Sequence, residues 1–372
     1  MTNSFIEPFV SAIENLPRLL ANPDESGKRY MGYLCTYTPI ELIHAAGFVP
    51  VRLFAGPGEV EQAYAHVPDF ICPFLKRVIQ RAAGGGYAAL SGLIQGYTCD
   101  AACGVVNTIK EIMPEKPVFS IPIPYGKSGR ARLFLKSAMD EAICKLESVG
   151  GDFSQNSIAR SIQLYESIRK LQYFLYEPRD DGALPLSAKD RISVMTAGTC
   201  MPPEAYLEQL ARLEVDLAHD PGIAPRGVPV LVSGSLVEST EIFDAIEASG
   251  GFVVCDDLCN GFRQIPPFAG QGKTPMDRLA DRYISRMPCP SRSRAVDRCD
   301  DIAGLAQKHG AAAIIFVLQK FCTPHLSDFP ILSEELNKKG YPVLLIEMDE
   351  SWAVSGQTRT RLESFFEMTG GA

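Results

Sequence analysis

Short apolar runs alternate with amphipathic stretches along most of this sequence. Seven runs rich in Val, Ile or Leu, often bounded by Gly or Pro, have the pattern of buried parallel strands; they are Phe48–Phe54, Ala88–Gly96, Val118–Ile123, Val228–Ser233, Phe252–Cys255, Ala311–Leu318 and Pro342–Met348. Helical patterns lie between them, at Pro39–Ala46, Ala102–Ile112, Ala131–Leu146, Glu241–Ser249, Asp300–His309, Ser327–Lys338 and Gln357–Met368. Strands that alternate with helices over short connections predict βαβ units and parallel sheets covered on both faces.

One stretch departs from this alternation. Between Phe153 and His219 the sequence has two long helical patterns, Ser157–Tyr176 and Pro203–Leu217, and little strand signal. The segment Pro221–Gly227 contains turn residues that mark a boundary. We therefore predict an α/β protein with two Rossmann-like (flavodoxin-like) parallel-sheet domains, at 1–150 and 227–372, and a helical connector at 151–226. The two halves should be similar, although the sequence shows no convincing internal repeat.

Length and charge narrow the class of protein. A chain of 372 residues is too long for one ordinary core and suggests about two domains. The net charge of −8 argues against a nucleic-acid-binding surface. No run of about 18 apolar residues is present, so no membrane span is expected. The first residues, MTNSFIEPFV, lack the pattern of a signal peptide, which favours a cytoplasmic protein.

Eleven cysteines are the most informative part of the composition. An odd count in a large chain does not predict a disulfide framework, so metal ligation or redox chemistry is the main alternative to plain buried thiols. Cys99, Cys259 and Cys322 each follow a predicted strand. The carboxyl ends of parallel strands form the edge at which open α/β sheets build their binding crevices.

Three other cysteines also occupy positions suited to a functional site. Cys35 and Cys72 come just before predicted helices, whose N-termini favour thiolate over thiol, and Cys289 lies between two prolines. Dispersed thiolates favour a cluster that joins two domains over a compact zinc knuckle. A zinc site built from two C-x₃-C pairs remains open, with the ligands Cys99, Cys103, Cys255 and Cys259. Otherwise we expect structural roles for Cys103, Cys144, Cys200, Cys255 and Cys299.

Nucleotide-binding motifs are incomplete. Gly272-Lys273-Thr274 and Gly126-Lys127-Ser128 both lack the leading glycine that a phosphate-binding P-loop requires. No predicted strand leads into a G-x-G-x-x-G turn, so a dinucleotide-binding fingerprint is also missing. Any nucleotide hydrolysis that supports this protein is therefore expected on another chain.

Several ordered segments resemble the 2-hydroxyacyl-CoA dehydratase and benzoyl-CoA reductase family. They extend over most of the chain, from Met31 to Met368, and comprise Gly32–Gly47, Val49–Arg52, Thr98–Asp100, Asp256–Arg263, Lys320–Cys322, Ile346–Asp349 and Gln357–Glu363. The resemblance implies a two-domain α/β protein with a helical part. It also implies a [4Fe–4S] cluster on Cys72, Cys99 and Cys322, and a separate ATP-hydrolysing iron–sulfur activator that injects low-potential electrons.

Cys35, Cys259 and Cys289 lie in contexts that resemble the double-cubane branch of this family. The resemblance there implies an [8Fe–9S] cluster, with three cysteines for each cubane, in an oxygen-sensitive homodimer. We therefore expect an oxidoreductase that reduces a small molecule with activator-driven electrons. Two alternatives stay open: a subunit of a heteromeric [4Fe–4S] 2-hydroxyacyl-CoA dehydratase, which is a lyase, and a non-catalytic electron-transfer module.

Four further residues are candidates beside the cysteines. Arg263 and Lys320 are expected to place positive charge near the cluster, with a surface ion pair as the alternative for each. His325, three residues beyond Cys322, is a candidate proton donor. Glu41 is a weaker candidate for proton relay, because a carboxylate in the first turn of a helix is already explained by the helix dipole.

Overall fold

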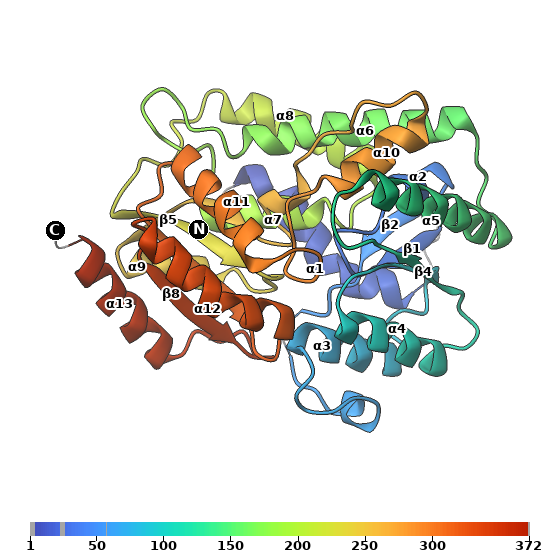
Figure 1. Ribbon diagram of the computed structural model, residues 1–372, viewed down its shortest axis with the longest axis horizontal. Helices are drawn as coiled ribbons and strands as arrows, with labels where there is room; N and C mark the ends of the chain where they lie inside the picture. Colours follow the sequence, from blue (N-terminus) through green and yellow to red (C-terminus); the bar gives the residue numbers. More distant parts are fainter. Residues whose placement is uncertain (1–3, 23–26, 57, 371–372) are drawn as a thin grey trace.

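The computed structural model describes residues 4–22, 27–56 and 58–370 and contains two four-stranded parallel sheets (Figure 1). The N-terminal sheet has the order β2-β1-β3-β4, from β1 (Tyr30–Tyr33), β2 (Val49–Arg52), β3 (Leu90–Tyr97) and β4 (Val118–Pro122). The C-terminal sheet has the order β6-β5-β7-β8, from β5 (Val228–Gly234), β6 (Gly251–Asp257), β7 (Ala313–Gln319) and β8 (Val343–Met348). The two sheets share one strand order, so the predicted fold class and the similarity of the halves are confirmed.

Helices surround both sheets. Those of the N-terminal half and the connector are α1 (Glu7–Ala21), α2 (Ile40–Ala45), α3 (Pro73–Ala83), α4 (Asp100–Ile112), α5 (Gly129–Ser148), α6 (Gln155–Phe174), α7 (Ala188–Ala197) and α8 (Pro203–Leu217). Those of the C-terminal half are α9 (Glu241–Ala248), α10 (Pro275–Ile284), α11 (Ala295–Lys308), α12 (Thr323–Lys338) and α13 (Gly356–Gly370). Among the described residues, no helix is long and apolar enough to cross a membrane.

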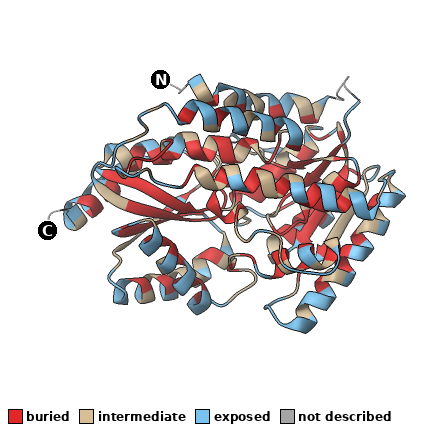
Figure 2. Cartoon of the chain, turned by 90° about the horizontal axis from the view of Figure 1, so that it is seen from above, coloured by how far each residue is buried: buried red, intermediate tan, exposed pale blue. Residues whose placement is uncertain are grey.

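Each sheet separates two apolar cores, as a parallel sheet covered on both faces requires. Along β7, Ile314, Phe316 and Leu318 pack on the core under α11 and α12, whereas Ile315 and Val317 pack on the core under α9 and α13. The side chains of a strand alternate between its two faces, so this continuous apolar run serves both cores. Figure 2 shows the consequence: the central strands are buried, the edge strands β4 and β8 are only partly buried, and the outer faces of the helices are exposed.

The seven predicted strands all occur, with ends displaced by two residues or fewer. The central strand β1 was not predicted, because its four residues include Gly32 and two tyrosines and do not form an apolar run. Helices α1, α7 and α10 were not predicted either. Helices α11 and α12 begin earlier than the predicted starts at Asp300 and Ser327. The start of α12 at Thr323 places Cys322 directly at its N-terminus.

Of the helices that connect the two sheets in sequence, α6 and α8 lie side by side along the top of Figure 1, whereas α7 lies deeper and contacts α1 and α9. Helix α6 contacts α2, α8 and α10, so it links elements from both halves. The domain boundaries at 150 and 226 enclose α6, α7 and α8, and they stay a prediction.

The strand order creates a switch point in each half. In the first sheet, the connection from β1 leads to β2 on one side, and the chain then crosses to β3 on the other. The carboxyl ends of β1 and β3 therefore diverge into loops that leave a crevice, which is where ligands bind in open α/β sheets. The same relation holds for β5 and β7 in the second sheet. The two halves are therefore expected to form equivalent crevices at the carboxyl ends of their strands.

We predict that Gly96→Ala destabilises the first switch point. A Cβ atom at Gly96 would lie 2.8 Å from the Tyr37 carbonyl carbon and 2.9 Å from the Thr38 nitrogen, both of which are backbone atoms with little freedom to move. We expect the free energy of unfolding to fall by about 1–3 kcal/mol in urea titrations. Gly104 is the matched control, because it lies exposed in α4 with nothing within 4 Å of its Cβ position. Gly104→Ala should stabilise the protein by roughly 1 kcal/mol, and equal effects of the two changes would contradict the analysis.

Candidate functional site

A cavity of about 320 Å³ lies where the two switch points face each other. Its walls include residues that follow β1, β3, β5 and β7, namely Leu34, Thr98, Ser235 and Phe321. All six cysteines singled out in the sequence line this cavity: Cys35, Cys72, Cys99, Cys259, Cys289 and Cys322. The structure thus gathers on one cavity six thiols that are separated by as many as 287 positions in the chain, from 35 to 322.

Four of these cysteines lie just beyond the carboxyl end of a strand. Cys35 follows β1, Cys99 follows β3, Cys259 follows β6 and Cys322 follows β7. Cys99 and Cys322 occupy equivalent places, because β3 and β7 hold the same position in the two sheets. Sequence analysis found three of the four strand ends and missed the one before Cys35.

Three of the cysteines are also the N-cap residues of helices. Cys72 precedes α3, Cys99 precedes α4 and Cys322 precedes α12. Free backbone N–H groups and the positive end of the helix dipole therefore point toward these sulfur atoms. Cys35 does not share this arrangement, contrary to expectation, because α2 begins only at Ile40 and its N-cap is Pro39.

Two buried glutamines hold the loops of the cavity, and sequence analysis missed both. Gln95 on β3 accepts hydrogen bonds from the Leu34 and Cys35 amides at 3.0 and 3.2 Å. Gln319 on β7 accepts from the Phe74 amide at 2.7 Å, and its own amide group donates to the Leu236 carbonyl at 2.9 Å. A polar residue at the end of an apolar strand, shortly before a cysteine, was the signal that could have identified them.

The first group of thiols is Cys72, Cys99 and Cys322. The hydrogen bond with Cys322 lowers the pKa of Cys72, and the same bond raises the pKa of Cys322 well above its usual value. Cys99 accepts from the Ala102 amide at 3.4 Å, but burial dominates and raises its pKa to about 12. The charges of Cys72 on Cys99, and of Cys99 on Cys322, contribute to these shifts, and all three thiols line the same cavity.

The second group is Cys35, Cys259 and Cys289. Burial raises the pKa of Cys289 to about 11, and the neighbouring Cys259 and Cys35 add to the shift. Thr98 donates its hydroxyl to the Cys35 sulfur at 3.4 Å. The two groups adjoin, since Cys35 and Cys289 also act on Cys99.

Arg263 is buried beside the second group. Its Nε donates to Asp257 Oδ1 at 2.7 Å, and its Nη1 donates to Cys259 Sγ at 3.3 Å. Burial would lower its pKa, but Asp257 and Cys259 raise it well above the usual value, so the guanidinium remains charged. The structure therefore places positive charge directly on a cysteine sulfur rather than in a surface ion pair.

A second arginine, Arg52, lines the cavity with only 3% of its surface exposed. It donates to the Leu34 carbonyl at 2.8 Å and to the Cys259 carbonyl at 2.7 Å. None of the described carboxylates forms an ion pair with it. Its charge therefore faces the cavity without a protein counter-ion.

His325 also lines the cavity, in the first turn of α12. Burial, followed by the charges of Arg298 and Arg263, lowers the pKa of its ring well below the usual value. The ring is therefore neutral at pH 7. It is available as a hydrogen-bond donor or a proton acceptor, but imidazolium would be scarce.

The structure does not bring Lys320 or Glu41 to the cavity. Lys320 is about half exposed and pairs with Asp349 at 3.5 Å, which is the surface ion pair that was its alternative. Glu41 is fully buried in α2, where it pairs with Arg169 of α6 and accepts from the Tyr283 hydroxyl of α10 at 2.7 Å. We therefore leave both residues out of the candidate site.

The remaining cysteines lie elsewhere. Cys103 is buried on α4, Cys255 in β6, and neither lines the cavity, so the two C-x₃-C pairs do not converge. Cys144 is exposed, whereas Cys200 and Cys299 are buried. Within the described part of the chain, no three His, Cys, Asp or Glu side chains come together as one metal ion would need. The thiols surround a space instead of a point.

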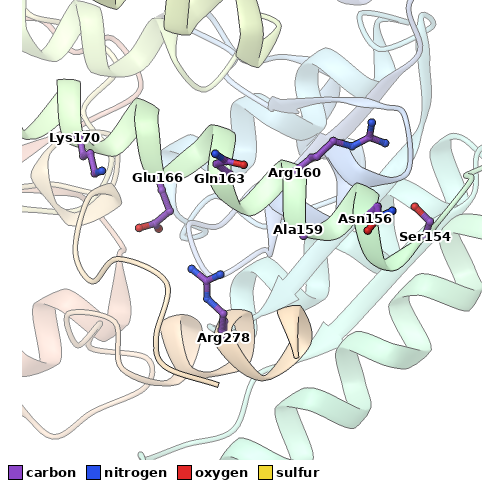
Figure 3. A pocket seen from close by; sticks show the side chains of 8 residues that line it. All are labelled: Ser154, Asn156, Ala159, Arg160, Gln163, Glu166, Lys170 and Arg278. Atoms are coloured by element: carbon purple, nitrogen blue, oxygen red, sulfur yellow. The ribbon is translucent and has the colours of Figure 1, made fainter. Parts of the chain in front are cut away.

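A second hollow is of a different kind. It is an open groove between α6 and α10 whose lining includes Arg160, Lys170 and Arg278 (Figure 3). Glu166 lies between them and accepts from the Ala269 amide at 2.8 Å. The groove contains none of the six cysteines, so it is separate from the candidate site.

Comparisons with known proteins give the relatives of the whole chain. A family model described as 2-hydroxyglutaryl-CoA dehydratase, D-component, matches residues 35–369. The (R)-phenyllactyl-CoA dehydratase beta subunit of Clostridium sporogenes is 27% identical, over 99% of this chain and 100% of its own. The lactoyl-CoA dehydratase beta subunit of Anaerotignum propionicum is 29% identical, over 92% of each chain. A benzoyl-CoA reductase subunit from Thauera aromatica is 22% identical, over 90% of this chain and 88% of its own.

The buried Glu41 predicts a pH dependence of stability. Burial raises its pKa, but Arg169 and Arg282 outweigh burial and lower the value from 4.5 to about 2. A lowered carboxyl pKa contributes stability above pH 4.5 that is lost as the pH falls toward 2, by about 3 kcal/mol in all. At pH 7, Glu41→Gln should cost about 3–5 kcal/mol, because the buried Arg282 loses its carboxylate partner and the buried Arg169 keeps only Glu166.

Urea titrations at several pH values test this prediction. Glu41→Gln should flatten the loss of stability between pH 4.5 and 2 in addition to lowering stability at pH 7. Glu204→Gln is the matched control, because Glu204 is exposed and pairs with His44 at 2.9 Å on the surface. A control that matches Glu41→Gln at pH 7 would contradict the role of burial.

Proposed function

The chain belongs to the 2-hydroxyglutaryl-CoA dehydratase D-component family, and from this membership we propose that it is the iron–sulfur reductase component of a two-protein system. It takes low-potential electrons from an ATP-hydrolysing activator and reduces a small molecule at a double-cubane [8Fe–9S] cluster. The single observation that carries the proposal is the convergence of six cysteines, from six separate segments, on one cavity.

The donor set fits such a cluster. Soft thiolates are the ligands that iron–sulfur clusters take, and a cavity can hold several irons where a point holds one. Two adjoining groups of three thiols suit two joined cubanes, one held by Cys72, Cys99 and Cys322 and the other by Cys35, Cys259 and Cys289. When bound, the cluster would supply low-potential electrons to a substrate in the cavity.

The chain's own residues offset part of the cost of burying negative charge on these sulfurs. The N-termini of α3, α4 and α12 point at Cys72, Cys99 and Cys322, and this effect opposes the burial that raises the pKa of Cys99. The Arg263 guanidinium donates to Cys259 Sγ at 3.3 Å. Hydrogen bonds to sulfur are one of the means by which proteins set cluster potential. Both effects stabilise the reduced, more negative state.

The cavity also limits the substrate. Its volume is about 320 Å³. That value is at the lower end of the range for small-molecule sites, which extends from roughly 300 Å³ upward. The cluster would fill part of the space, which leaves room for a small molecule only. Arg52 supplies a charged donor for a polar group, and the neutral His325 ring is positioned to orient a substrate or to exchange a proton with it.

Partners and compartment follow from the same chemistry. The chain lacks a complete P-loop, so we assign ATP hydrolysis to the activator, and we place the chain in a homodimer as the double-cubane resemblance implies. All eleven cysteines are free thiols. Free thiols are typical of a reducing compartment, which supports a cytoplasmic location.

The alternative is one subunit of a [4Fe–4S] 2-hydroxyacyl-CoA dehydratase. Two observations favour it: the relatives include beta subunits of such dehydratases, and Cys72, Cys99 and Cys322 alone combine thiol with helix N-cap. In that case the enzyme is a lyase, and a related second subunit should co-purify with the chain.

Iron and acid-labile sulfide per chain distinguish the two functions. Protein purified without oxygen is expected to hold about eight irons if both groups of thiols are ligands, and about four if only the first is. Cys72→Ser and Cys259→Ser should each lower the iron content under the first model. Under the second, only Cys72→Ser should do so, because Cys259 is then not a ligand.

Cys144→Ser is the matched control, since Cys144 is exposed on α5 and does not line the cavity. It should retain the full iron content. If Cys72→Ser and Cys99→Ser both kept full iron, the cluster assignment would be wrong. Stoichiometric zinc in place of iron would remove the redox function altogether.

A further inference from the structure

Phe321 occupies an unusual place between the cavity and bulk solvent. Its residue surface is 46% exposed, yet it is one of the residues that line the cavity. Nearby residues are less exposed than Phe321. Gln319 is almost completely buried, and Cys322, one of the six cavity thiols, is partly buried. A residue that is both exposed and cavity-lining lies at the mouth.

The backbone at this position is strained. Phe321 has a φ angle of 59°. This positive value lies in the left-handed region that large side chains avoid. Phe321 is the third residue of a tight turn, which is closed by a hydrogen bond of 3.1 Å from the Cys322 amide to the Gln319 carbonyl. Turns that need a positive φ at this position ordinarily place Gly or Asn there. Glycine would fit this turn without strain, so the sequence retains an aromatic ring at an energetic cost.

The surroundings hold the turn in place. The Gln319 side chain is fixed by Phe74 and Leu236, as described above, and the Lys320 amide donates to the Met348 carbonyl at 2.8 Å. Cys322 is the N-cap of α12. Strain of this kind persists where neighbouring structure leaves no alternative, and it gathers at functional sites. The turn therefore presents the ring to the mouth in a fixed position.

We propose that the Phe321 ring partly closes the mouth of the cavity and determines which molecules reach the thiols by their size. It acts as a specificity-determining residue for small, compact molecules. Together with Phe74, Leu75 and Pro324 it makes this part of the wall apolar. The inference rests on the proposed function only in treating the cavity as a reaction chamber, and its test does not require a bound cluster.

Thiol labelling of the full-length chain, freed of metal under reducing conditions, tests the proposal. Iodoacetamide and a bulky fluorescein maleimide serve as small and large probes, and mass spectrometry reports each cysteine separately. Phe321→Ala should speed labelling of Cys35 and Cys99 by the large probe about tenfold, with a smaller change for the small probe. Comparing the same thiol between variants cancels differences in its intrinsic reactivity.

Two controls keep the test decisive. Cys144 is exposed and lies outside the cavity, so its labelling rate should be the same in every variant. Phe321→Tyr keeps the ring and should label like the wild type, whereas Phe321→Leu should be intermediate. Unchanged labelling of Cys35 and Cys99 by the large probe in Phe321→Ala would overturn the proposal. A uniform rise that includes Cys144 would also overturn it, because general loosening would then explain the effect.

Stability measurements separate strain from the loss of the ring. Phe321→Gly and Phe321→Ala both remove the ring, but only Gly accepts the positive φ without strain. The urea midpoint of Phe321→Gly should therefore exceed that of Phe321→Ala, while both variants label equally fast. Equal midpoints would show that the turn is not strained and would remove the argument for a retained ring. If iron never binds but the labelling result holds, the proposed function fails and the role of Phe321 stands.

Discussion

The structure depends on one constraint, which is that the carboxyl ends of parallel strands all leave a sheet at the same edge. Two sheets of identical strand order place those edges against each other, and loops from β1, β3, β5 and β7 meet around one cavity. The two buried glutamines stabilise this meeting. Gln95 holds the loop after β1, and Gln319 holds the loop after β5 and the start of α3. Gln95 therefore connects β3 to the loop after β1, and Gln319 connects β7 to the loop after β5, so each glutamine spans one switch point.

Buried arginines lie beside the thiols of a molecule that is negatively charged overall. The chain carries a net charge of −8, yet Arg52 and Arg263 are buried beside the thiols and three helix N-termini point toward them. Of these two arginines, Arg263 has a carboxylate partner, Asp257, and Arg52 has none among the described residues. Buried positive charge without a counter-ion is costly, so the surroundings are arranged for a negatively charged occupant. Protonated thiols alone do not supply that charge, whereas thiolates bound to a cluster would.

Binding in the cavity and access to the cavity depend on different parts of the site. In the proposed function, the thiols, the arginines and the helix termini select what binds in the cavity, since they supply donor atoms and charge. The apolar wall and the strained turn at Phe321 determine what can enter. The strained residue directly precedes a cavity cysteine, so the geometry that fixes a thiol also fixes the ring at the mouth.

The sequence by itself determined the fold class, the seven recognisable strands and the six cysteines of the cavity. These follow from local patterns: apolar runs of strand length, and cysteines placed where strands end and helices begin. It did not reveal β1, because a four-residue strand with a glycine has no distinctive periodicity, although β1 lies between β2 and β3 in the sheet. Glu41 and Lys320 are near Cys35 and Cys322 in sequence but do not line the cavity, and Lys320 forms the surface ion pair that was its alternative. Only the tertiary structure decided that the six thiols share one cavity, the roles of Gln95 and Gln319, and the burial of Arg263, because each depends on contacts between segments that lie far apart in the chain.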